Sequence, residues 1–152
     1  MPVSQMAHMP EKLKHVLDEL DGLGADERAD YLVEFSNEFQ DVPARVAERP
    51  FPDEHRVPKC ESEAYVWAED RADGTLDFHY AVENRHGISA RAVATLLKDT
   101  LSREPLEDVA AVSPEIVSRI FGRQLSMGKG EGLTGIVEMT VAEAKKRLKD
   151  RA

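Results

Sequence analysis

The segment from Thr75 to Glu83 restricts the fold most, because its side chains alternate strictly between two faces. One face carries the large apolar residues Leu76, Phe78, Tyr80 and Val82, and the other carries Thr75, Asp77, His79 and Ala81. This period of two is typical of a β-strand. The segment Glu63–Glu69 (EAYVWAE) is rich in aromatic and branched residues and predicts a second strand, with a turn at Ala72-Asp73-Gly74 between the two. The chain is therefore expected to form a β-hairpin.

Apolar residues at three- and four-residue spacing predict helices on both sides of this hairpin. The expected helices are Met9–Leu23, a second that begins near Asp26, one from an N-cap at Ser89 to about Ser102, a short turn at Leu106–Val109, one from Ser113 to Phe121, and Leu133–Lys149. Two stretches lack the pattern. The four prolines between Val42 and Pro58 predict an irregular connection, and the glycine-studded segment SMGKGEG (126–132) predicts a flexible loop before the last helix.

These predictions together give an α+β fold, in which a small antiparallel sheet packs against several helices. The length of 152 residues fits one domain over residues 1–152, with a flexible N-terminus over residues 1–8.

Charge and hydropathy exclude several classes of partner. The chain has 20 Lys and Arg against 29 Asp and Glu, a net charge of −9, so neither nucleic acid nor an anionic membrane surface is an expected partner. No apolar run approaches the roughly 20 residues of a membrane span, and the N-terminal sequence lacks the apolar stretch of a signal peptide. A cytoplasmic location is therefore expected.

Cys60 is the only cysteine, so an intrachain disulfide is excluded and a thiolate metal cluster is not expected. It lies between the proline-rich segment and the first strand, where a thiol can be exposed and mobile, as nucleophilic or sulfur-accepting chemistry requires. Lys59 favours the thiolate, whereas Glu61 and Glu63 disfavour it, which indicates a passive acceptor rather than a self-activated nucleophile. The alternative is a buried and inert thiol, the common state of lone cysteines.

Other side chains with possible chemistry give weaker signals. The five histidines have no metal-ligand spacing, which disfavours a zinc site built on Cys60 and His55. His55 or His86 could approach Cys60 in the fold and assist proton movement, with plain loop histidines as the alternative. The loop around Lys129 either contacts a partner through its free amides and its lysine or serves as a linker.

The run Val57-Pro58-Lys59-Cys60-Glu61-Ser62, followed by a strand with Tyr65 and Trp67, resembles the sulfur-acceptor segment of the SufE family. In that family a Gly-Cys-x-Ser element leads into a Val-Trp-type strand. The order of the helices and the hairpin is also similar, over roughly Leu13 to Leu148. The resemblance implies a SufE/NifU-like α+β fold.

The resemblance also implies a function. SufE proteins take persulfide sulfur from a cysteine desulfurase of the SufS type, stimulate that enzyme, and pass the sulfur on towards iron–sulfur cluster assembly. Cys60 then matches the acceptor cysteine, Ser62 matches the serine two positions later, and Lys129 matches a basic residue before the last helix. Such a carrier has no independent turnover, no metal and no cofactor, because pyridoxal phosphate belongs to the desulfurase; a downstream iron–sulfur scaffold is the second partner. The alternative is an interaction module of the same fold that regulates a partner without carrying sulfur.

The sequence departs from the family pattern around the cysteine. Lys59 stands where the family usually has glycine, and Glu61 and Glu63 stand where amides are common. The chain therefore resembles a somewhat divergent member, and the sequence leaves open which desulfurase and which final sulfur acceptor it serves.

Overall fold

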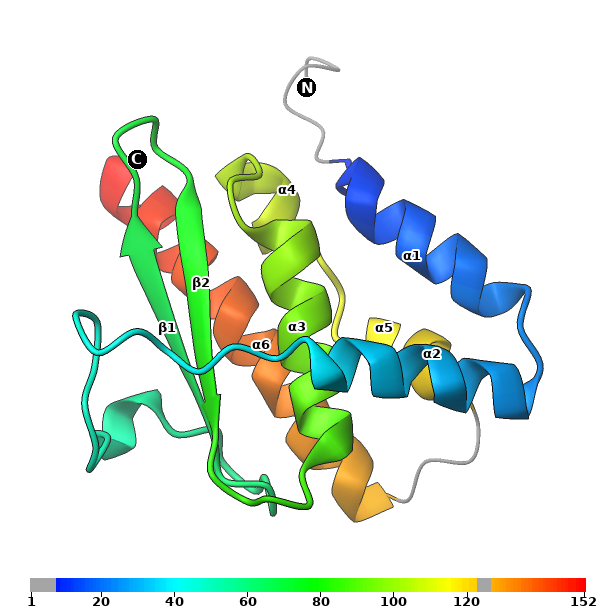
Figure 1. Ribbon diagram of the computed structural model, residues 1–152. Helices are drawn as coiled ribbons and strands as arrows, with labels where there is room; N and C mark the ends of the chain where they lie inside the picture. Colours follow the sequence, from blue (N-terminus) through cyan, green and yellow to red (C-terminus); the bar gives the residue numbers. More distant parts are fainter. Residues whose placement is uncertain (1–7, 123–126) are drawn as a thin grey trace.

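The structure is a computed structural model that describes residues 8–122 and 127–152. Its elements follow in the order α1 (Glu11–Asp21), α2 (Ala25–Asn37), the 3₁₀ helix η2 (Asp53–His55), β1 (Ala64–Asp70), β2 (Leu76–Val82), α3 (Ile88–Leu101), α4 (Leu106–Ala110), α5 (Ile116–Phe121) and α6 (Met127–Arg151). In Figure 1 the hairpin stands at one side, and α3 lies between it and the N-terminal helices α1 and α2. The fold is α+β, as predicted.

The two strands form the antiparallel hairpin that the alternating pattern predicts. Their register runs from Ala64 opposite Val82 to Asp70 opposite Leu76. At the turn, the Asp73 Oδ1 atom accepts a hydrogen bond from the Thr75 amide (3.0 Å), and Gly74 adopts a φ of 88°, which glycine tolerates without a steric cost. The predicted strands and the predicted turn between them are therefore both confirmed.

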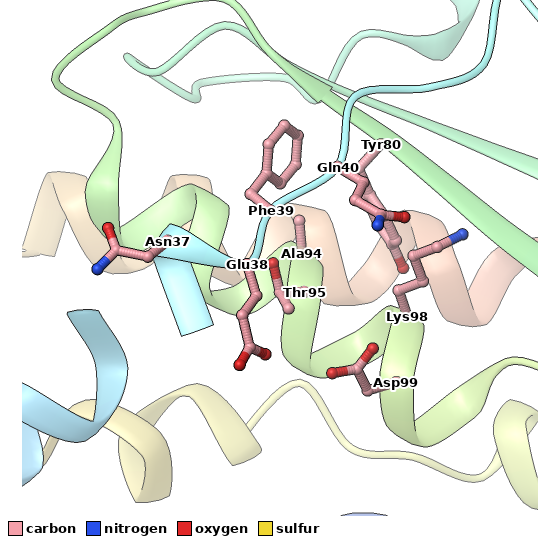
Figure 2. Close-up of a pocket in the computed structure, with 9 residues that line it drawn as sticks. All are labelled: Asn37, Glu38, Phe39, Gln40, Tyr80, Ala94, Thr95, Lys98 and Asp99. Atoms are coloured by element: carbon pink, nitrogen blue, oxygen red, sulfur yellow. The ribbon is translucent and has the colours of Figure 1, made fainter. Parts of the chain in front are cut away.

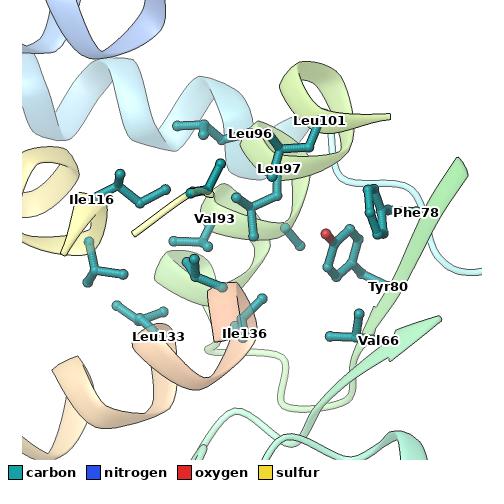
Figure 3. Close-up of a cluster of buried hydrophobic side chains, with 14 of the residues drawn as sticks. Val66, Phe78, Tyr80, Val93, Leu96, Leu97, Leu101, Ile116, Leu133 and Ile136 are labelled. Carbon is teal, nitrogen blue, oxygen red and sulfur yellow. The ribbon is translucent and has the colours of Figure 1, made fainter. Parts of the chain in front are cut away.

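The inner face of the hairpin packs on α3 and α6 and forms the main core (Figure 3). Phe78 and Tyr80 of β2 lie there with Leu97 of α3 and Ile136 of α6, all at most 2% exposed. The Thr140 hydroxyl donates to the Ile136 carbonyl (2.9 Å), so the Tyr80 hydroxyl must donate in its 2.8 Å bond to Thr140. The polar pair that this part of the core encloses is thus hydrogen-bonded.

The outer face of the hairpin is also covered, by the proline-rich connection that precedes β1. A second apolar cluster joins the two segments: Val42, Phe51, Tyr65, Trp67 and Ala81. The Phe51 ring centroid lies 5.1 Å from that of Tyr65 and 4.9 Å from that of Trp67. This packing explains how an irregular, proline-containing segment keeps a fixed course, and it places the start of the Cys60 segment against β1.

The structure corrects the predicted starts of two helices, and a third expectation, about the N-terminus, concerns mainly residues that it does not describe. The last helix begins at Met127 instead of Leu133, so the predicted flexible loop is helical from Met127 onward. Glycine disfavours a helix by only about 1 kcal/mol per residue, and tertiary packing of α6 overcomes this. The N-cap of α3 is Gly87 rather than Ser89. The expected flexible N-terminus at 1–8 falls, except for the exposed His8, outside the described residues.

In the part of the chain that the structure describes, none of the helices combines the length and apolar character that a membrane crossing needs.

Candidate functional site

Cys60 lies in a short loop, residues 58–63, that ends where β1 begins; we call it the Cys60 loop. Backbone hydrogen bonds hold both of its ends. Before the loop, the Val57 amide donates to the Ala64 carbonyl (2.8 Å). Within and after it, the Glu63 amide donates to the Cys60 carbonyl (3.1 Å), and the Asn84 amide donates to the Ser62 carbonyl (3.1 Å). The loop is therefore a tight turn that the hairpin anchors.

The thiol of Cys60 is buried, because the loop folds back onto α6. Cys60 is 8% exposed and belongs to the main apolar core, next to Leu133. The sequence is compatible with either an exposed or a buried thiol, and in the structure the thiol is buried. Cys60 nevertheless lines a surface groove, so its loop lies at the molecular surface.

A small recess of about 40 Å³ beside Cys60 brings together all three site residues that the sequence predicts. Cys60 and Ser62 contribute from the loop, and Lys129 contributes from the first turns of α6. The remaining lining residues are Glu61, Ser89, Gly132 and Leu133. Their shared position agrees with a common site, whereas their roles in chemistry stay a prediction.

Sequence reasoning missed three residues of this recess: Ser89, Gly132 and Leu133. The sequence predicts Ser89 as a helix cap, but Ser89 lies in the first turn of α3 and lines the recess. The sequence predicts Gly132 in a flexible loop, yet Gly132 is helical and contacts the cysteine backbone. Nothing in the spacing of the sequence places Gly132 beside Cys60.

Two surface grooves adjoin the Cys60 loop and share two of its residues. One groove, of about 540 Å³, lies towards η2 and is lined by Asp53 and Arg56. The other, of about 770 Å³, lies along α6 and is lined by Glu131 and Glu138. Pro58 and Lys59 line both grooves. The surface beside Cys60 therefore carries mixed charge and is mainly acidic.

Lys59 occupies a backbone conformation that glycine prefers, with a φ of 59°. A non-glycine residue in this left-handed region costs about 1–2 kcal/mol, and glycine loses about 0.5–1 kcal/mol in extra conformational entropy on folding. Lys59→Gly is therefore expected to raise the free energy of unfolding by about 0.5–1 kcal/mol, measured from the urea midpoint at constant slope.

Lys145→Gly is the matched control, because Lys145 is also exposed but lies inside α6. There the same replacement is expected to lower the free energy of unfolding by about 1 kcal/mol. A loss of stability in both variants would contradict the strain assigned to Lys59.

The histidines do not join this site. His55 stacks on Trp67 (5.3 Å between ring centroids), and its Nδ1 donates to the Val66 carbonyl (2.9 Å). His86 is exposed, and neither histidine lines the recess. Within residues 8–122 and 127–152, no group of three or more His, Cys, Asp or Glu side chains is placed to hold a metal ion.

A separate cavity of about 560 Å³ is formed by the end of α2 with the segment after it, β2 and α3 (Figure 2). Burial lowers the pKa of Lys98, whose Nζ donates to the Phe78 carbonyl (2.7 Å). Burial, with the nearby Glu38 carboxylate, raises the pKa of Asp99. This cavity shares no lining residue with the recess and grooves around Cys60 and is a separate feature of the surface.

Comparison with known proteins identifies the family of this chain. Residues 14–144 match the model of the Fe-S metabolism associated domain, SufE. The chain therefore belongs to the SufE family, a family of iron–sulfur metabolism.

The solution structure of a hypothetical protein from Thermus thermophilus is similar in fold, with a TM-score of 0.74 and 24% sequence identity. The match covers 93% of this chain and 99% of that one. No match to a curated protein was found.

Proposed function

We propose that this protein is a sulfur acceptor that takes persulfide sulfur from a cysteine desulfurase of the SufS type onto Cys60 and passes it on for iron–sulfur cluster assembly. One observation carries the proposal: in a SufE-family domain, the single cysteine lies on a surface loop over a recess that also contains Ser62 and Lys129. The pyridoxal phosphate that releases the sulfur belongs to the desulfurase, and this chain has no turnover of its own.

The transfer is a thiol exchange. The Cys60 thiolate attacks the outer sulfur of the donor persulfide, a new S–S bond forms at Cys60, and the donor S–S bond breaks. The donor cysteine leaves as a thiolate and takes up the proton that Cys60 lost. The sulfur keeps its oxidation state, so the step needs no external oxidant or reductant.

The first requirement of this step is access, because Cys60 lines the groove towards η2 but is only 8% exposed, which leaves little of its surface for another protein's persulfide. The Cys60 loop must therefore turn outward. Two of its residues, Lys59 (φ 59°) and Glu63 (φ 52°), hold left-handed backbone conformations near its two ends. Such residues persist only while the surrounding contacts fix them, so the strain favours release of the loop.

The second requirement is protection of the loaded sulfur. A cavity needs about 10–15 Å³ to admit one water-sized group, so the recess of about 40 Å³ has room for one added sulfur atom. Lys129 and the first turn of α3, through Ser89, line this recess. A lysine and a helix N-terminus both stabilise negative charge, which the persulfide anion carries. The closed loop can thus hold the loaded sulfur away from solvent.

A second candidate function is an interaction module that binds a partner through the grooves while Cys60 stays idle. The burial of Cys60 favours this candidate, since buried cysteines are commonly structural. The two candidates differ in whether sulfur ever reaches the chain.

Intact-mass spectrometry separates them. The protein is mixed with a SufS-type cysteine desulfurase and free cysteine, and a carrier is expected to gain about 32 Da, the mass of one sulfur atom on a thiol. The same mixture without cysteine is the control. A chain that binds the desulfurase in gel filtration yet shows no mass gain would support the interaction module and contradict the carrier.

A further inference from the structure

The glycines of α6 that face the Cys60 loop are not explained by the function proposed so far. Glycine is the least favourable residue inside a helix apart from proline, and α6 contains Gly132 and Gly135 within its first half. Helix propensity does not explain why glycine occupies these two positions, so the reason must lie in the packing around them.

The distances supply that reason. A Cβ atom on Gly132 would lie 3.0 Å from the Cys60 Cα, 3.2 Å from the Lys59 carbonyl oxygen and 3.3 Å from the Cys60 Cβ. Two of these three atoms belong to the loop backbone, which cannot rotate away as a flexible side chain can. The backbone of Cys60 thus rests directly on the α6 backbone at Gly132.

Gly135 continues this contact one turn further along. A Cβ atom there would lie 2.7 Å from Cγ1 of Val57, which is 1% exposed and immediately precedes the Cys60 loop. Gly132 contacts the cysteine itself, and Gly135 contacts the anchor from which the loop departs. We call these two glycines the glycine seat.

We propose that Gly132 and Gly135 are positioning residues that set how deeply Cys60 is buried at rest, and hence how often its loop opens. The inference rests on the proposed function, because a carrier needs its thiol covered between transfers and released during them. A larger side chain at Gly132 overpacks the closed state, and the three closest atoms it would meet all belong to the Cys60 loop, so an outward turn of the loop relieves the overpacking. It therefore shifts the equilibrium towards the open, reactive loop.

The test is the rate at which iodoacetamide alkylates Cys60 in the native protein, without urea and without any desulfurase. Gly132→Val is expected to raise this rate by at least about tenfold, and Gly132→Ala to give a smaller rise between that of wild type and Val. Gly22→Val is the matched control, because a Cβ at Gly22 meets only the Glu19 carbonyl oxygen, at an ordinary 3.6 Å. It is expected to alkylate like wild type.

Each urea unfolding curve is recorded in parallel, so that a rise in reactivity is compared with the fraction of globally unfolded chain. If Gly132→Val does not fold, Gly132→Ala and Gly135→Ala carry the test. The proposal that the glycine seat controls loop opening would be overturned by either of two results. One is a wild-type alkylation rate in the folded Gly132 variants, and the other is a rise in rate that the unfolded fraction fully accounts for. Because the desulfurase is absent, a failure of the carrier function appears separately, as the missing mass gain, and leaves this readout unchanged.

Discussion

Cys60→Ser is expected to reduce desulfurase turnover, measured as alanine formed from cysteine, to the rate of the desulfurase alone. The hydroxyl cannot take up a sulfane sulfur under these conditions, whereas the loop backbone and both grooves remain. Binding to the desulfurase is therefore expected to persist, which gel filtration or calorimetry measures. The loss is complete rather than partial, because Cys60 is the only thiol in the chain.

Two further variants serve as controls for the loss of stimulation in Cys60→Ser. Cys60→Ala, which avoids placing a hydroxyl in a site that is 8% exposed, is expected to behave like the serine variant. Ser118→Ala, at an exposed serine of α5, is expected to stimulate like wild type. Stimulation by Cys60→Ser at the wild-type level would show that the protein acts by binding alone.

Leu97→Ala is expected to lower the free energy of unfolding by about 3 kcal/mol, because truncation of a fully buried leucine removes apolar contacts and leaves a cavity. Leu97 is 0% exposed and lies on α3, which packs against β2, α6 and both N-terminal helices. The loss is large against the roughly 5–15 kcal/mol that stabilise a typical domain. The urea midpoint, with an unchanged slope, measures it.

Ile88→Ala removes the same number of atoms from the same helix, at a side chain that is 50% exposed. Its effect is expected to stay within about 0.5 kcal/mol. Equal losses in the two variants would mean that α3 does not pack as the structure has it.

The parts of the fold that follow from periodicity could be predicted from the sequence. The alternation in Thr75–Glu83 indicated the strand and its inner face, because a pleated strand turns every second side chain to the same side. Helix spacing located α1 and α3 to within a few residues. Periodicity could not predict that the proline-rich connection covers the outer face of the hairpin. Phe51, which packs on Tyr65 and Trp67, lies in a segment without regular structure.

The candidate site was predictable in its residue types and only partly in its geometry. The resemblance around Cys60 pointed to Cys60, Ser62 and Lys129, which the structure brings to one recess. It did not indicate the depth of the thiol, because that depends on the contact between the loop backbone and Gly132. Local propensity favours a flexible loop at those glycines, whereas a close approach of two backbones requires them inside a helix.

The most direct measurement of sulfur carriage is a single turnover with cysteine that contains a heavy sulfur isotope. The desulfurase is loaded, mixed with this protein and removed, and peptides of the chain are mapped by mass spectrometry. Heavy sulfur is expected on the peptide that contains Cys60, at close to one atom per chain, and dithiothreitol is expected to release it as sulfide. A chain free of label while the desulfurase keeps its persulfide would contradict the account.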